Sequence, residues 1–213
     1  ESQRYAFGCA GEGSGEGDRI HHLAMEGIVV INERQEWELT GKGDCREHYH
    51  LEDRGPFPIP HGSFYDTTSQ TAVSTTAAYP MMLNSTVTHA GVDLEAGSRV
   101  VIRQPGIYNI QFSAQFANPD AQDYNVAIWL RVSGADVPES CTALSVPSKH
   151  GSSLGHHVAA WNFMQRMQRG EYFEMVWATE STSVYIAALT SSAGPPSRPA
   201  IPSVIVTANM VSI

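Results

Sequence analysis

The chain has 213 residues, of which 42% are hydrophobic and 16% are charged, with 18 glycines and 12 prolines. This composition is typical of a globular chain rich in turns and argues against disorder over most of its length. A net charge of −9 without a Lys/Arg cluster argues against nucleic acid or an anionic membrane surface as a partner, because both require concentrated positive charge.

Three cysteines, Cys9, Cys45 and Cys141, stand at wide spacings. Their odd number does not suit a secreted disulfide framework, so we expect free thiols and folding in a reducing compartment. Apolar runs such as residues 28–31 are too short to span a bilayer, and no charged-then-apolar signal segment opens the sequence. The sequence therefore predicts a soluble protein.

Residues 1–61 differ from the rest of the chain in charge. They hold 6 of the 13 Lys and Arg residues and 12 of the 22 Asp and Glu residues. Two strand-like pieces, 27–32 and 36–40, are expected to pair as a hairpin. Residues 54–60 then carry three prolines in five positions, which favours an extended connection. The sequence therefore predicts an N-terminal docking arm, 1–61, and a second domain, 62–213.

From residue 62 onward, short apolar runs alternate with Gly, Pro, Asn, Asp and Ser, as in a sandwich or barrel. Residues 107–116 alternate strictly between apolar residues and Asn, Gln or Ser, which predicts a strand with one buried face and one amide face. Further strands are expected at 63–66, 81–86, 99–103, 125–132, 158–164, 172–179, 184–190 and 204–213. The prediction is an all-β jelly-roll sandwich of about eight strands, with residues 191–199 as an exposed loop.

A family resemblance rests on five segments: 62–71 (GSFYDTTSQT), 97–102 (GSRVVI), 106–115 (GIYNIQFSAQ), 169–173 (RGEYF) and 204–211 (VIVTANMV). Together they resemble the C-terminal modules of tailed-phage structural proteins, which look like the TNF/C1q jelly-roll class. The resemblance covers residues 62–213 and implies a homotrimer packed through apolar residues of one sheet. The chain departs from the eukaryotic members because it has no Gly-X-Y repeat.

Four large side chains are predicted to form the trimer interface: Trp129, Tyr172, Tyr185 and Leu189. Each alternates onto the face opposite the other large apolar groups of its strand, so a monomer would expose an apolar patch. Burying these rings at a subunit contact would contribute on the order of several kcal/mol per copy. The alternative left open is that one sheet curls so that both of its faces pack within one chain.

Several residues are of types that bind metal ions, but their spacing does not favour a metal site. Cys45, His48, His50 and His61 include zinc-ligand types but match no common structural spacing. The adjacent histidines His21-His22 and His156-His157 would point their side chains to opposite faces in an extended strand, which disfavours joint binding of a metal ion. Asp120 and Asp123 suit a turn, with calcium as the alternative.

Glycine-rich segments also lack the context that chemistry needs. Residues 11–17 have no lysine and no strand-to-helix setting for phosphate, and residues 151–155 lack the spacing of a nucleophile elbow. The sequence therefore predicts no catalytic residue, no metal site, no cofactor and no enzymatic activity.

The functional hypothesis is a tailed-phage virion protein assembled in the host cytoplasm, most simply a trimeric capsid decoration (cement) protein. Its arm would dock on the major capsid protein or other virion proteins. One alternative is a receptor- or glycan-binding head, in which Tyr124 and Asn125 contact a host-surface sugar. Another is a small hydrolase that uses Cys141 or a bound metal.

Overall fold

The computed structural model describes residues 59–213 and three strands before them, and the chain divides into two compact units, Glu1–Phe57 and Pro58–Ile213. In the first unit, β1 (Arg4–Phe7), β2 (Gly27–Ile31) and β3 (Trp37–Thr40) form an antiparallel sheet with β2 in the middle. The expected pairing of β2 with β3 is confirmed, whereas β1 lies where no strand is predicted. The division falls inside the proline-rich connection.

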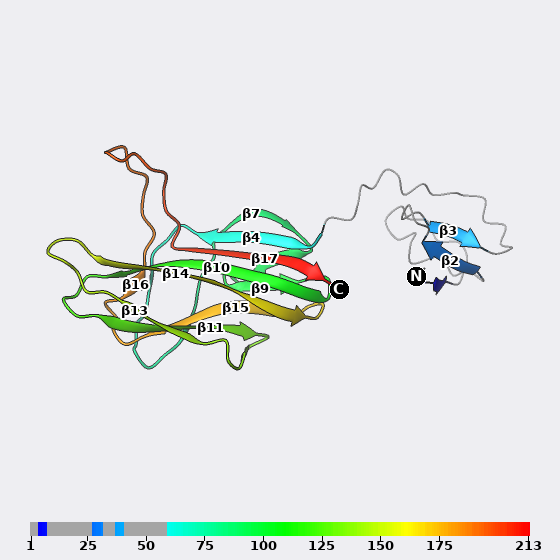
Figure 1. Cartoon of the computed structure of the whole chain (residues 1–213), viewed down its shortest axis with the longest axis horizontal. Coiled ribbons are helices and arrows are strands. Elements are labelled where there is room, and N and C mark those ends of the chain that lie inside the picture. The colour runs from blue at the N-terminus through cyan, green and yellow to red at the C-terminus, as the bar shows by residue number, and fades with distance from the viewer. Residues whose placement is uncertain (1–3, 8–26, 32–36, 41–58) are drawn as a thin grey trace. The chain divides into compact units, whose positions relative to one another are not determined.

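The second unit is a sandwich of two antiparallel sheets (Figure 1). The first, here the β10 sheet, is built around the longest central strand. One side of β10 pairs over its whole length with β14, and the other side pairs with β17 and then β16. Its strands are β4 (His61–Asp66), β5 (Gln70–Thr71), β7 (Ser85–Ala90), β10 (Gly106–Asn118), β14 (Gly155–Met167), β16 (Tyr185–Ile186) and β17 (Val204–Ser212).

The second sheet, here the β11 sheet, has the order β12-β11-β15-β9-β8, with β13 paired to β11 and β6 paired to β15. Its strands are β6 (Tyr79–Pro80), β8 (Val92–Glu95), β9 (Arg99–Ile102), β11 (Tyr124–Val132), β12 (Ala135–Asp136), β13 (Thr142–Val146) and β15 (Tyr172–Thr179). The chain passes repeatedly from one sheet to the other, so each sheet combines segments that are distant in sequence.

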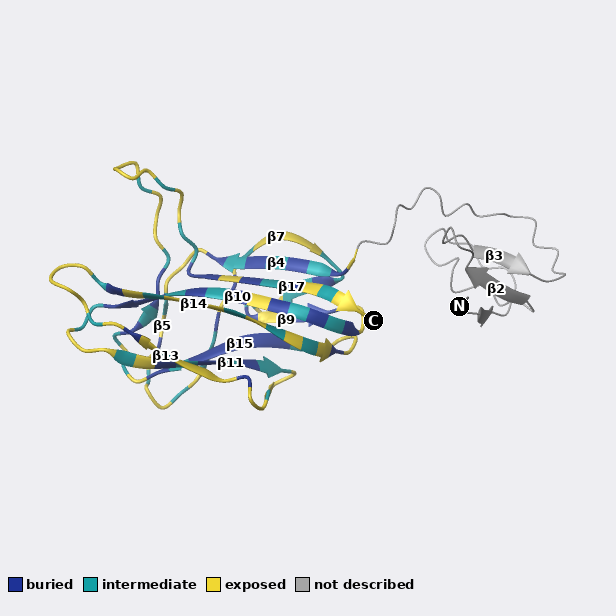
Figure 2. Cartoon of the chain, viewed as in Figure 1, coloured by how far each residue is buried: buried dark blue, intermediate teal, exposed yellow. Residues whose placement is uncertain are grey.

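The core lies between the inner faces of the two sheets, where Figure 2 shows alternating buried positions along the strands. The alternation expected for residues 107–116 is present, because Tyr108, Ile110 and Phe112 are buried while the amides between them are not. From the opposite sheet, Ile128 and Trp177 are fully buried against them. Burial of each such side chain contributes about 1.5–3 kcal/mol.

The predicted all-β sandwich is confirmed, but the strand list needs correction. Ten strands of four or more residues form the second unit, and two of them, β8 and β13, were not predicted. The strand predicted at 81–86 is displaced, because β7 spans Ser85–Ala90 and only the last two predicted residues belong to it. Met81 and Leu83 are buried in the connection between β6 and β7, with their N–H groups bonded to Met175 and Gly97 carbonyls across the β11 sheet.

The predicted strand 184–190 is also shorter than expected, since β16 ends at Ile186. The chain then leaves the sandwich as a projecting hairpin, held by bridges between Leu189 and Ile201 and between Ser192 and Arg198 (Figure 1). The Arg198 guanidinium donates to the Thr190 carbonyl at 2.9 Å across this hairpin. The expected exposed loop is thus confirmed at its tip.

Candidate assembly surface

The outer face of the β10 sheet carries an uncharged patch. On β4, β17 and β10, the side chains that point away from the core include no Asp, Glu, Lys or Arg between residues 63–65, 109–115 and 205–209. We call this patch the amide face; it comprises Ser63, Tyr65, Asn109, Gln111, Ser113, Gln115, Ile205, Thr207 and Asn209.

Strand register makes the amide face continuous. Thr207 lies between Ser63 of β4 and Gln111 of β10, and Ile205 lies between Tyr65 and Ser113. Interface centres are depleted in charged residues. In a chain with a net charge of −9, this face carries no carboxylate that would repel another copy.

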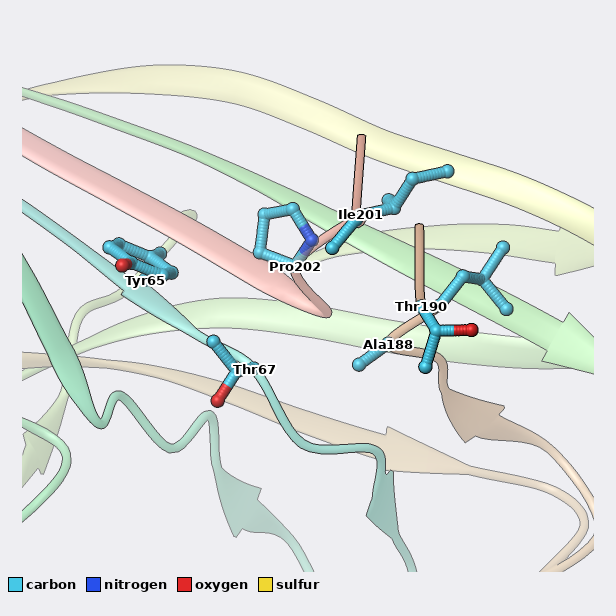
Figure 3. A pocket seen from close by; sticks show the side chains of 8 residues that line it. Tyr65, Thr67, Ala188, Thr190, Ile201 and Pro202 are labelled. Carbon is cyan, nitrogen blue, oxygen red and sulfur yellow. The ribbon is translucent and has the colours of Figure 1, made fainter. Parts of the chain in front are cut away.

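Two shallow hollows are lined in part by residues of the amide face. The larger, about 220 Å³, is bounded by Tyr65 at the end of β4 and by Leu189, Ile201 and Pro202 at the root of the projecting hairpin (Figure 3). The smaller, about 180 Å³, is lined by residues of β10 and β17 that include Ile205. Neither is lined by His, Cys, Asp, Glu or Lys, so both fit apolar contact better than acid–base chemistry.

The outer face of the β11 sheet is charged instead. Arg131 and Asp136 form an ion pair at 2.7 Å, and Trp129 Nε1 donates to the same carboxylate at 2.8 Å. The hydrogen bonds from Arg131 and then from Trp129 lower the pKa of Asp136. Nearby, the Arg99 guanidinium lies 4.6 Å above the ring of Tyr172. These contacts give the two rings partners within their own chain.

The structure does not bring the four predicted interface residues together. Trp129 on β11 and Tyr172 on β15 share the charged outer face of the β11 sheet, where both are half-buried. Tyr185 belongs to β16 of the other sheet, and Leu189 lines the larger hollow. Their part in a trimer stays a prediction. The alternation of amides at 107–116 indicates part of the amide face in the sequence. The rest of the amide face depends on the pairing of β17 and β4 beside β10, which the sequence alone does not reveal.

Of the four residues of the predicted zinc-ligand types, the structure describes only His61. Cys45, His48 and His50 lie outside the described residues, as do residues 11–17 and 21–22. The His61 ring contacts the Ile59 carbonyl at 2.8 Å and the Thr88 hydroxyl at 3.3 Å. Within the described residues, no group of three His, Cys, Asp or Glu is arranged to hold a metal ion.

The acidic loop after β10 is organised by its own hydrogen bonds. Asp123 accepts the Ser148 N–H at 2.7 Å, which lowers the pKa of Asp123. The Asp120 N–H donates to the Asn118 side chain at 2.9 Å, as in an Asx turn. On β14, His156 and His157 point to opposite faces.

Tyr124 and Asn125, the residues of the sugar-binding alternative, lie at the start of β11, and Cys141 lies just before β13. Asn125 donates from its backbone N–H and its side-chain amide to Glu180, at 2.9 and 3.2 Å. Tyr124 packs in part against the core cluster, whereas Asn125 is exposed. Cys141 is exposed as a free thiol.

No protein-family model matches the chain, and no curated protein is detectably similar to it in sequence. The described residues contain no helix long and apolar enough to cross a membrane.

Proposed function

We propose that the chain is a structural protein of a tailed-phage virion, a capsid decoration protein that assembles as a trimer through the amide face. The observation that carries this proposal is the uncharged amide face on β4, β17 and β10 in a chain of net charge −9. Assembly would bury Tyr65, Ile205 and the hollows that they line, all of which are in contact with solvent in a monomer. The work of such a protein is done by surface burial.

The N-terminal residues 1–61 supply the second contact in this proposal. Their excess of carboxylates favours a partner with a basic surface, such as the outside of a capsid shell. The jelly-roll unit would then project from the shell while the arm holds it there.

A single isosteric change tests the trimer. Gln111→Glu adds one carboxylate near the middle of the amide face in every copy, so we expect the full chain to fall from trimer to monomer in native mass measurements. Gln122→Glu is the matched control, since Gln122 is exposed in the loop before β11 and is not one of the residues of the amide face. A Q111E chain that keeps its trimer overturns the amide face as the interface.

The same measurement on Trp129→Ala tests the alternative interface on the β11 sheet, where Trp129 and Tyr172 lie. If Trp129→Ala dissociates the trimer while Q111E does not, copies meet on the β11 sheet. A wild-type chain that is monomeric at micromolar concentration would remove the trimer altogether.

The virion role is tested by locating the protein on particles. Images of intact virions should place the unit 58–213 on the outside of the capsid at three-fold positions. Binding to a defined glycan on an array, lost on shaving the projecting hairpin or on Asn125→Ala, would instead support the receptor-binding alternative.

A further inference from the structure

Strand β14 has a long free edge. It is 13 residues long and pairs with β10 from Gly106 to Asn118 without a register shift. In the part of the chain that the structure describes, no strand pairs with its other edge. Proteins usually shorten, charge or cover such an edge, because unpaired N–H and C=O groups bind other strands.

The hydrogen bonds of β10 show which residues of β14 face that edge. Gln115 donates to the Ser203 carbonyl at 2.9 Å and accepts from the Ala187 N–H at 2.7 Å, so its backbone groups face β16 and β17. Backbone direction alternates along a strand, so Ala114 and Phe116 face β14 and bond to their partners Ala159 and His157.

The alternate residues of β14 therefore turn their N–H and C=O groups to the free edge. We call these six residues the edge row: His156, Val158, Ala160, Asn162, Met164 and Arg166. In agreement, the Arg166 carbonyl is reached by the side chain of Gln165 at 3.2 Å and not by β10. All six side chains are exposed.

The edge row is self-complementary about Trp161. Its two apolar members, Val158 and Met164, are 56% and 59% exposed and lie three residues either side of that centre. The row has no carboxylate, so a second copy of this acidic chain can approach without like-charge repulsion from Asp or Glu. The same register about Trp161 places His156 opposite Arg166 at both ends of the contact.

We propose that β14 pairs antiparallel with β14 of a second copy, about a two-fold axis at Trp161, so that Val158 of each copy lies opposite Met164 of the other. Six residue pairs, each exchanging two hydrogen bonds, give twelve bonds across the contact. That number lies within the roughly 10 ± 5 of a specific interface. The hydrogen bonds of this contact use the free edge of β14, although the edge-row side chains stand on the same side of the sheet as the amide face, with Asn162 opposite Gln111.

Cysteine substitution tests the register. In antiparallel pairs that exchange hydrogen bonds, Cα atoms lie about 5.5 Å apart, within disulfide range. Full-length V158C mixed with M164C should form, under mild oxidation, a disulfide between positions 158 and 164 that peptide mass spectrometry identifies. Each variant alone is the matched control and should not link to itself at that position. Self-linking of V158C, or no link in the mixture, overturns the register.

Proline substitution tests the pairing itself. Ala160→Pro removes an N–H that faces the free edge, so the fold should persist while the mass of the assembly falls by half. Ala159→Pro removes an N–H bonded to β10 and should destabilise the fold, which confirms the direction assigned to the backbone. An A160P chain with unchanged mass overturns the proposal. Because Q111E should leave the 158–164 link intact, failure of the trimer and failure of the edge contact are distinguishable.

Discussion

Trp161 lies directly across the β10–β14 ladder from Phe112, with ring centroids 4.6 Å apart and ring planes at 80°. The Nε1 atom of Trp161 is buried and has no hydrogen-bond partner in the part of the chain that the structure describes. The indole therefore contributes an edge-to-face aromatic contact together with an unsatisfied donor, two effects of opposite sign on stability.

Conservative and non-conservative substitutions of Trp161 should separate these effects. Trp161→Ala removes the aromatic contact and should lower the free energy of unfolding by about 3 kcal/mol. Trp161→Phe keeps a ring against Phe112 and removes the unpaired N–H, so its stability should stay within about 1 kcal/mol of the wild type. Urea unfolding measures both. A W161F chain as unstable as W161A would show that the N–H is bonded in solution.

Gly155, at the start of β14, allows no side chain. A Cβ atom there would lie 1.7 Å from the Pro147 carbonyl oxygen, which belongs to the backbone and cannot rotate away. Gly155→Ala should cost about 3 kcal/mol or more in thermal or urea unfolding. Gly151→Ala is the control, because Gly151 has open space but a φ of +60°, and should cost about 1–2 kcal/mol. Equal costs would contradict the clash.

Ser98 and Glu174 form a nearly buried hydrogen bond at 2.6 Å, with Arg99 Nε 3.9 Å from the same carboxylate oxygen. Ser98→Ala should cost about 2 kcal/mol at neutral pH, because hydrogen bonds to charged groups are the stronger kind. In a Glu174→Gln background the same change should cost only about 1 kcal/mol. A double-mutant cycle by urea unfolding measures the difference, and identical costs would mean that the serine does not recognise the charge.

Acid stability should depend on Asp93. A hydrogen bond from Arg103 at 2.6 Å, opposed in part by desolvation, lowers the pKa of Asp93 below its ordinary value of 3.8. Since the folded pKa is the lower one, the pair stabilises the fold above pH 3.8, and this contribution is lost as the pH falls through the folded pKa.

Asp93→Asn and Arg103→Gln should therefore each reduce the fall in the free energy of unfolding between neutral and acidic pH. In the double variant this fall should be the same as in either single variant, because each change already removes the pair. Unfolding curves between neutral and strongly acidic pH measure this effect. Additive changes in the double variant would show that the two side chains act independently.

Local pattern was enough for the central strands. The alternation at 107–116 predicted β10 and assigned its buried and amide faces correctly, because side chains of a strand alternate whatever its neighbours are. The predicted 172–179 strand coincides with β15. Pattern misplaced the strand at residues 81–86, because Met81 and Leu83 are buried in the connection between β6 and β7, where their N–H groups bond to the carbonyls of Met175 and Gly97.

The surfaces were beyond local pattern. Nothing near Gln111 in sequence indicates that Thr207 lies beside it, or that Asn162 lies on its other side. The same holds for the free edge of β14, since an edge is defined by the strand that is missing next to it.

The sequence by itself determined that the second unit is an all-β sandwich, where its longest strands lie, and which of their faces are apolar. These properties follow from side-chain alternation and turn residues, which act over a few positions. Only the tertiary structure decided that β4, β17 and β10 join their uncharged faces and that β14 ends the sheet. Strand order is set by burial of the core between segments nearly 150 residues apart, such as His61 and Asn209, and short-range pattern carries no information about it.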